Sequence, residues 1–179
     1  MRFEATNIEG LMAVRLERRA DERGSFARLF CRDEFAAAGL KTEFVQQSLS
    51  VTQKAGTLRG MHFQRAPHAE VKFIRCVRGA IYDVVADLRP DSPSYLRWQA
   101  FRLDQHGDVS LYIPAGCAHG FQSLQDDCEV LYQMDVPYQP NSADGCRYDD
   151  KALSIDWPLP VTVIAKKDLE WRPLARAAG

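Results

Sequence analysis

The 179-residue sequence lacks an excess of charge of either sign and any long apolar run. Its 23 Lys and Arg residues offset 24 Asp and Glu residues, which gives a formal net charge of −1. This balance leaves no electrostatic footprint for nucleic acid or an anionic membrane. No apolar run approaches the length of a membrane span, and the charged N-terminus MRFEATNIEG does not have the pattern of a signal peptide. We therefore expect a cytoplasmic protein that binds neither nucleic acid nor membrane.

The sequence also lacks paired cysteines. Its five cysteines are widely spaced and form no CxxC pair, which argues against a disulfide framework or a zinc knuckle. We predict free thiols in a reducing compartment. The five are Cys31, Cys76, Cys117, Cys128 and Cys146.

What remains is the composition of an ordinary globular protein. Hydrophobic residues make up 46% and charged residues 26%, and neither a repeat nor a low-complexity linker occurs. The length fits one domain. We expect a single domain over 1–179, with an N-terminal arm over about 1–45, a jelly roll over about 46–140 and a C-terminal segment that packs back over about 141–179.

Short β-rich segments separated by Gly, Asp and Pro dominate the chain after residue 45. One helix is expected over CRDEFAAAGL, residues 31–40, closed by Gly39. The tail segments SIDWPLP and VIAKKDLEW indicate irregular chain that packs on the barrel. The pattern favours an all-β jelly roll with a few short helices. The expected strands lie at 71–77, 80–88, 95–103, 109–114, 119–124 and 129–136.

Period-two alternation places four polar side chains on apolar strand faces. Lys72, Asp83, His119 and Tyr132 each alternate in step with the apolar residues of their strand. Buried charges are costly unless they are paired, so four such residues on inward faces indicate a site. Taken singly, Lys72 and Asp83 could form a structural ion pair, and Tyr132 could be a core tyrosine whose hydroxyl meets a carbonyl.

The segment TLRGMHFQ, residues 57–64, sets Arg59, a glycine and His62 within four residues. By itself His62 could be a metal ligand, a proton-transfer base or a hydrogen-bonded core histidine. Asp168, in AKKDL, would by default be a surface or helix-capping carboxylate. Arg59 and Arg23 would by default be solvated.

Seven motifs carry a resemblance to a known family: DERGSF, FVQ, LRGMHFQ, HAEVKFIRCVRGAIYDVVADLR, YIPAGCAHGF, LYQMD and AKKD. They stand in the order seen in dTDP-4-dehydrorhamnose 3,5-epimerases, so the chain resembles that family over nearly its whole length. The resemblance implies a cupin jelly-roll barrel with N-terminal dimerisation strands, a homodimer, and an isomerase without a cofactor. It further implies a nucleotide-linked 4-keto-6-deoxy sugar, epimerised at C3 and/or C5 in deoxysugar (rhamnose-like) biosynthesis.

The resemblance also implies a role for each matching residue. His62 matches the general base, oriented by Asp168, and Tyr132 matches the acid that returns a proton on the opposite face of the sugar. Lys72 matches the residue beside the C4 oxygen, with Asp83 holding it in place. The implied substrate contacts are Arg23, Phe26 (from the partner subunit), Arg28, Gln46, Ser48, Arg59, His119 and Tyr138.

The chemistry of the reaction accounts for these residue types. Protons on C3 and C5 flank a C4 ketone, so removal of either gives an enolate with its charge on the C4 oxygen. A neutral imidazole is a suitable base when a carboxylate on its other nitrogen fixes the tautomer. An ammonium in a dry barrel stabilises the developing oxyanion. We expect no redox cofactor, because the substrate arrives with its ketone made.

A metal site is the main chemical alternative. Metal cupins begin their first motif with His-x-His, whereas this chain reads HFQ from His62. Glu70, His119 and His68 leave only an incomplete donor set, so we expect no metal. A metal-dependent cupin isomerase or dioxygenase stays open as an alternative, as does a catalytically silent cupin that binds sugar nucleotides.

Three departures from the family pattern concern the substrate. Arg28 stands where the family usually has Glu, Ser48 where it has Asn, and Met61 where it has Leu. The first two fall at the nucleotide end. Arg28 has only donors, which suit the acceptor N3 of cytosine and not the N3–H of thymine, so a CDP-linked or other non-thymidine substrate is one hypothesis. The alternative is that Arg28 turns to solvent or to a phosphate and dTDP still binds. A C3- or C5-only epimerase stays open too.

Overall fold

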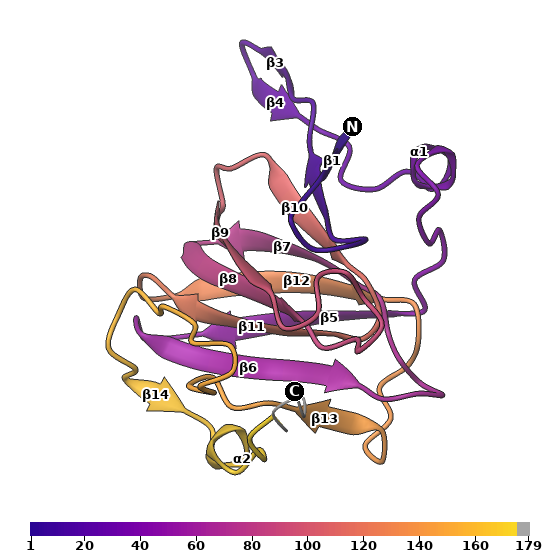
Figure 1. Ribbon diagram of the computed structural model, residues 1–179. Helices are drawn as coiled ribbons and strands as arrows, with labels where there is room; N and C mark the ends of the chain where they lie inside the picture. The colour runs from indigo at the N-terminus through magenta and orange to yellow at the C-terminus, as the bar shows by residue number, and fades with distance from the viewer. Residues whose placement is uncertain (175–179) are drawn as a thin grey trace.

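The computed structural model of the chain describes residues 1–174 and consists mainly of β-strands (Figure 1). Residues 175–179 of the expected C-terminal segment lie outside the described residues. In chain order the elements are β1 (Arg2–Ala5), β2 (Met12–Arg15), β3 (Arg19–Asp21), β4 (Gly24–Phe26), α1 (Arg32–Ala37), β5 (Gln46–Thr52), β6 (Thr57–Gln64), β7 (Lys72–Arg78), β8 (Ala80–Asp87), β9 (Trp98–Asp104), β10 (Val109–Ile113), β11 (Cys117–Ser123), β12 (Cys128–Met134), β13 (Ala143–Gly145), β14 (Val163–Ile164) and α2 (Lys166–Leu169).

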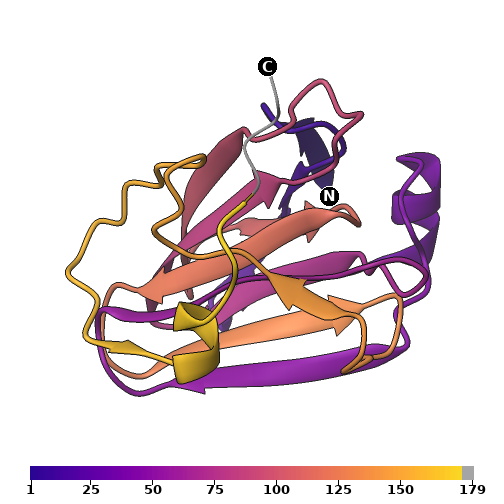
Figure 2. The same ribbon diagram turned by 60° about the horizontal axis from the view of Figure 1, so that its bottom comes forward.

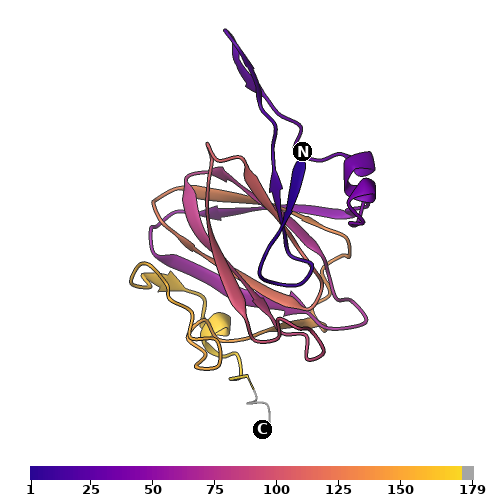
Figure 3. The same cartoon turned by 45° about the horizontal axis from the view of Figure 1, so that its top comes forward.

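Two sheets curve around a shared interior (Figure 3). The first has the order β1-β2-β10-β7-β12-β5, and the second has the order β13-β6-β11-β8-β9, with β14 added to β6. The N-terminal strands β1 and β2 thus extend the first sheet. The hairpin of β3 and β4 forms a separate two-stranded unit that projects away from the barrel (Figures 1 and 3). The predicted all-β architecture is confirmed.

The interior is filled by the inward faces that alternation predicted. One buried cluster combines Ile74 of β7, Ile81 and Val85 of β8, Phe121 of β11 and Val130 of β12. Full burial of each such side chain contributes about 1.5–3 kcal/mol to stability. The predicted strands match β7 to β12 within a few residues, and the largest shift is at β9, which begins at 98 because backbone hydrogen bonds fold residues 92–97 into turns.

The helix α1 ends as predicted. Gly39 follows it at φ +71, and its N–H donates to the carbonyl of Ala36. The fully buried Phe35 anchors the helix to the first sheet through edge-on contacts with Phe3 and Phe73. No helix within residues 1–174 is long and apolar enough to cross a membrane.

The expectation of an irregular tail was wrong in part. β14 pairs in parallel with β6 at residues 57–58, while β13 pairs with β6 at residues 62–64. The two short strands therefore share one edge of β6, which would otherwise leave its backbone groups unpaired. The tail gains order from this edge, which sequence periodicity does not reveal. Figure 2 shows α2 and the chain around it lying along one side of the barrel.

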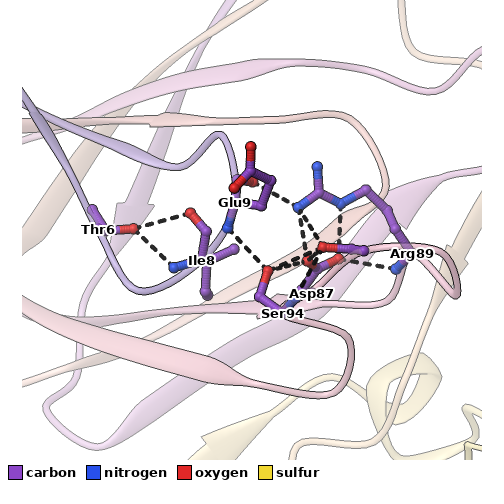
Figure 4. A network of polar contacts seen from close by, with 7 residues as sticks. Thr6, Ile8, Glu9, Asp87, Arg89 and Ser94 are labelled. Carbon is purple, nitrogen blue, oxygen red and sulfur yellow. Dashed lines mark hydrogen bonds and ion pairs between the residues drawn. The ribbon is translucent and has the colours of Figure 1, made fainter.

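A buried carboxylate fastens the turn between β1 and β2 to the barrel (Figure 4). Asp87 accepts hydrogen bonds from the Arg89 guanidinium at 2.7 and 2.8 Å and from the Ser94 hydroxyl at 2.6 Å. Arg89 also donates to the carbonyl of Glu9, and the Glu9 N–H donates to Ser94. Burial opposes the charge on Asp87, but the hydrogen bonds outweigh it and hold its pKa well below the usual range.

All five cysteines are free thiols, as predicted. Burial is the main cause that raises the pKa of Cys76, Cys117 and Cys146 to about 12. These thiols therefore stay protonated and behave as small core residues.

Candidate functional site

A cavity of about 710 Å³ opens on one side of the barrel, between strands of both sheets and the C-terminal tail. Its volume lies in the range of small-molecule sites. It brings together residues that are distant in sequence. The predicted site residues that line it are Gln46, Ser48, Arg59, His62, Lys72, His119, Tyr132, Tyr138 and Asp168.

A His–Asp pair stands at the wall of this cavity. Strand β6 presents His62, and α2 presents Asp168, whose Oδ1 lies 2.7 Å from His62 Nε2. The carboxylate is 2% exposed, and its other oxygen accepts the Gly60 N–H at 3.3 Å. Burial opposes the charge of Asp168, but the His62 hydrogen bond and its charge outweigh burial, and the pKa lies below its usual value. An ionised Asp168 fixes the hydrogen of His62 on Nε2 and leaves the Nδ1 lone pair as the base.

A glycine contact lets β6 and β11 approach closely beside this pair. Gly60 has φ +134, and a Cβ there would lie 2.5 Å from the Cα of Gly120. The ladder pairs His62 directly with His119 and then shifts register before Phe121. Directly paired residues point to the same face of a sheet, so both imidazoles face the interior.

His119 forms a second His–Asp pair, deeper in the barrel. Its Nε2 lies 2.8 Å from Asp83 Oδ2, and both side chains are buried. The ring of Tyr132 packs edge-on against His119, with centroids 5.8 Å apart. Burial and then the Asp83 charge raise the pKa of Tyr132, while Arg59 opposes them, so the phenol stays protonated.

This arrangement corrects one expectation. The burial of Lys72 and Asp83 is confirmed, but Asp83 does not hold Lys72. The Lys72 ammonium instead pairs with Glu70 at 3.1 Å and donates to the carbonyl of His62 at 3.0 Å. Alternation predicts which face a residue occupies, not its neighbour across the barrel. Asp83 lies diagonally opposite His119 within one sheet, whereas Lys72 belongs to the other sheet.

Three predicted contacts do not reach the cavity of their own chain. Arg23 and Phe26 belong to the β3–β4 hairpin region, and Arg28 follows it. Phe26 is 76% exposed, Arg23 pairs with Asp21, and Arg28 pairs with Glu34 at 2.8 Å. For Phe26, the expectation concerned a partner subunit. For Arg23 and Arg28, the contacts within the chain are local ion pairs of the arm.

Sequence reasoning missed two residues at the cavity wall. Trp171 lies edge-on to His62, with ring centroids 6.2 Å apart, and it follows Asp168 in a tail that was expected to pack on the barrel. Gln64 donates to Glu70 at 2.9 Å and so supports the partner of Lys72. Gln64 lies on the same face of its strand as His62, and this alternation could have identified it as a cavity residue. For Trp171, the large aromatic ring in the tail was the available sequence signal.

Two of the candidate metal donors are otherwise engaged. Glu70 contacts Lys72 and Gln64, and His119 contacts Asp83. Within residues 1–174, no group of three or more His, Cys, Asp or Glu side chains could hold a metal ion. The expected absence of a metal remains a prediction, because a donor count does not measure metal content.

Sequence comparison gives a family for this geometry. The sequence profile described as dTDP-4-dehydrorhamnose 3,5-epimerase matches residues 5–176. The dTDP-4-dehydrorhamnose 3,5-epimerase of Methanothermobacter thermautotrophicus is 39% identical over 176 residues, which cover 97% of this chain and 94% of that protein. The dTDP-4-dehydrorhamnose 3-epimerase of Streptomyces niveus is 37% identical over 178 residues, which cover 99% of this chain and 86% of that protein.

Structure comparison agrees. A crystal structure of dTDP-4-dehydrorhamnose 3,5-epimerase from Bacillus anthracis, with TDP and PPi bound, superimposes with a TM-score of 0.93 at 34% identity. The match covers 97% of this chain and 99% of that one. It confirms the predicted cupin-type β fold. The chain therefore belongs to the dTDP-4-dehydrorhamnose 3,5-epimerase family and is an isomerase that acts as a carbohydrate epimerase.

Proposed function

We propose that this protein epimerises a nucleotide-diphosphate-linked 4-keto-6-deoxy sugar at C3 and/or C5 by proton transfer through an enolate. The observation that carries the proposal is the pair of His62 and Asp168, 2.7 Å apart at the wall of a cavity that also contains Lys72 and Tyr132. One base, one oriented carboxylate, one ammonium and one phenol are the groups that such a reaction requires.

His62 removes the proton in this mechanism. With Nε2–H donated to Asp168, Nδ1 takes the hydrogen from the carbon beside the ketone, and the electron pair moves onto the C4 oxygen. Asp168 then stabilises the imidazolium. Lys72 stabilises the enolate oxygen with its ammonium, which Glu70 and the His62 carbonyl hold at the cavity wall.

Tyr132 completes the inversion. Its raised pKa keeps the hydroxyl protonated, so the phenol can deliver a proton to the carbon from the face opposite His62. The enolate then collapses to the ketone with inverted configuration, and exchange with solvent restores both side chains. The imidazole of His119, hydrogen-bonded to Asp83, packs against the ring of Tyr132.

Substrate and assembly are proposed on separate grounds. The Bacillus anthracis relative was solved with TDP bound, and the relatives are named for dTDP sugars, which supports dTDP as the nucleotide. The exposed Phe26 on a projecting hairpin supports a homodimer in which that hairpin reaches the partner's cavity. The free thiols fit a cytoplasmic enzyme. We propose no cofactor, because the C4 ketone alone acidifies both neighbouring carbons.

A heavy-water experiment tests the function. The protein is incubated with dTDP-4-keto-6-deoxyglucose in D₂O, and NMR follows deuterium uptake and configuration at C3 and C5. Uptake that disappears in His62→Asn supports the proposal, and Trp157→Phe, whose indole packs on Tyr82 away from the cavity, serves as the control. No uptake by the unaltered protein would favour a silent sugar-nucleotide binder. Activity that tracks bound metal, measured by elemental analysis before and after chelation, would favour the metal-dependent alternative.

A further inference from the structure

One short stretch of the tail touches His62 twice. Asp168 receives the Nε2–H, and three residues later the indole of Trp171 meets the imidazole edge-on, with an interplanar angle of 67°. Both residues line the cavity. A single hydrogen bond fixes one atom of the imidazole, but the ring can still tilt about that atom. A second contact on the ring itself removes this freedom.

The barrel has a space shaped for that indole. Gly145 of β13 pairs directly with His62 in the ladder with β6. A Cβ at position 145 would lie 2.5 Å from the backbone oxygen of Met61, 2.6 Å from Cε2 of Trp171 and 2.7 Å from its Nε1. The indole thus occupies the volume that a side chain opposite His62 would fill. A side chain at position 145 would collide both with that carbonyl and with the indole.

Hydrogen bonding does not account for this placement. The Nε1 of Trp171 is buried and has no hydrogen-bond partner within residues 1–174, which is unfavourable for a buried donor. The other two tryptophans are satisfied, since Trp98 donates to Leu153 at 2.8 Å and Trp157 donates to Tyr148 at 2.9 Å. Neither of these two lines the cavity. Trp171 gives up its hydrogen bond at the place where its ring meets the candidate base.

We propose that Trp171 is a positioning residue for His62. It holds the imidazole in the orientation in which Nε2 meets Asp168 and Nδ1 faces the substrate, and it closes that side of the ring to water. This inference rests on the proposed role of His62 as the base. The His62 side chain is 34% exposed, so it is reachable from the cavity, and its alignment depends on its neighbours. A misplacement of about 1 Å in such a group can cost about a hundredfold in rate.

Three single variants test the inference: Trp171→Ala, Trp171→Phe and the control Trp157→Phe. For Trp171→Ala we expect kcat to fall by about 10- to 100-fold, with KM and the calorimetric Kd for dTDP changed by no more than about threefold. Trp171→Phe keeps an aromatic ring and should recover kcat to within about fivefold of the unaltered protein. Trp157→Phe should leave all three quantities unchanged. Thermal unfolding of each variant checks that it is folded.

A double variant separates this inference from the proposed function. If Trp171 acts through His62, then His62→Asn combined with Trp171→Ala loses no more activity than His62→Asn alone. Additive losses would overturn the inference, as would full kcat in Trp171→Ala or a loss that Trp171→Phe does not restore. A loss confined to KM and Kd would make Trp171 a substrate contact and would also overturn it. Full activity in His62→Asn would instead overturn the proposed function.

Discussion

Replacing Asp168 by Asn tests the candidate site most directly, because the change alters charge and hydrogen bonding with little change in volume. The carboxylate now accepts from His62 Nε2 at 2.7 Å and from the Gly60 N–H at 3.3 Å. An amide cannot serve both. If its oxygen faces His62, its NH₂ group faces the Gly60 N–H, and two donors then meet without an acceptor. If its NH₂ faces His62, the ring hydrogen must move to Nδ1, and the base is lost.

The magnitude follows from the bond that is lost. A hydrogen bond to a charged group is worth about 1.5–3 kcal/mol, which corresponds to about 10- to 150-fold in kcat. Complete loss of general-base catalysis costs about 10²–10⁴-fold, so the Asn variant should be milder than His62→Ala. KM should change little, because Asp168 is 2% exposed and acts through His62.

Steady-state kinetics and deuterium uptake at C3 and C5 measure the effect. Both rates should fall together, since each requires the base. The reasoning is refuted if Asp168→Asn retains full kcat, or if KM rises while kcat stays constant. A calorimetric titration with dTDP, expected to be unchanged, confirms that the cavity is intact.

Four further outcomes are expected. His62→Asn should lose both epimerisation and deuterium uptake by about 10²–10⁴-fold while it still binds dTDP, and unchanged turnover would exclude it as the base. Tyr132→Phe should keep deuterium uptake longer than net inversion, and equal loss of both would remove its separate acid role. Asp87→Asn should lower the unfolding free energy at pH 7 by about 1.5–3 kcal/mol. Because the folded-state pKa of Asp87 is depressed, its stabilisation is present above the ordinary carboxyl pKa and is lost as the pH falls through the folded value. In denaturant titrations, the difference in unfolding free energy between the variant and the unaltered protein should therefore shrink below about pH 4. Calorimetry with dTDP, CDP, UDP and GDP should find dTDP tightest and unaffected by Arg28→Ala, since Arg28 pairs with Glu34, whereas tightest binding of CDP that depends on Arg28 would support the cytidine hypothesis.

Sequence alternation predicted which polar residues the barrel encloses. Lys72, Asp83 and His119 are all buried, because the period of a strand fixes the face on which each residue lies. It did not predict their partners. Asp83 meets His119 and not Lys72 because pairing depends on register between strands, and register is a property of the whole sheet.

Some of the residue contacts implied by the family resemblance are present in the structure, and others are not. His62 and Asp168 meet as implied, because both stand in motifs whose order the family shares. Arg23 stands in a shared motif too, and Arg28 follows it as a departure from the family pattern, yet the surroundings of both depend on where the hairpin docks, which a single chain does not determine. Trp171 was missed because its role arises from a missing side chain at Gly145, and a glycine leaves no periodic signal.

The sequence separation of the His62–Asp168 pair has a consequence for biosynthesis. The two residues are 106 positions apart, and Asp168 lies on α2, which follows all the strands of both sheets in the chain. During synthesis the barrel can therefore close around an imidazole that still lacks its carboxylate. Once the barrel has formed, only the chain between β13 and α2 remains to be closed into a loop, and the pairing of β14 with β6 offsets part of that entropy cost. A chain interrupted by a protease or a stalled ribosome before Asp168 would hold a nearly complete barrel without a working base.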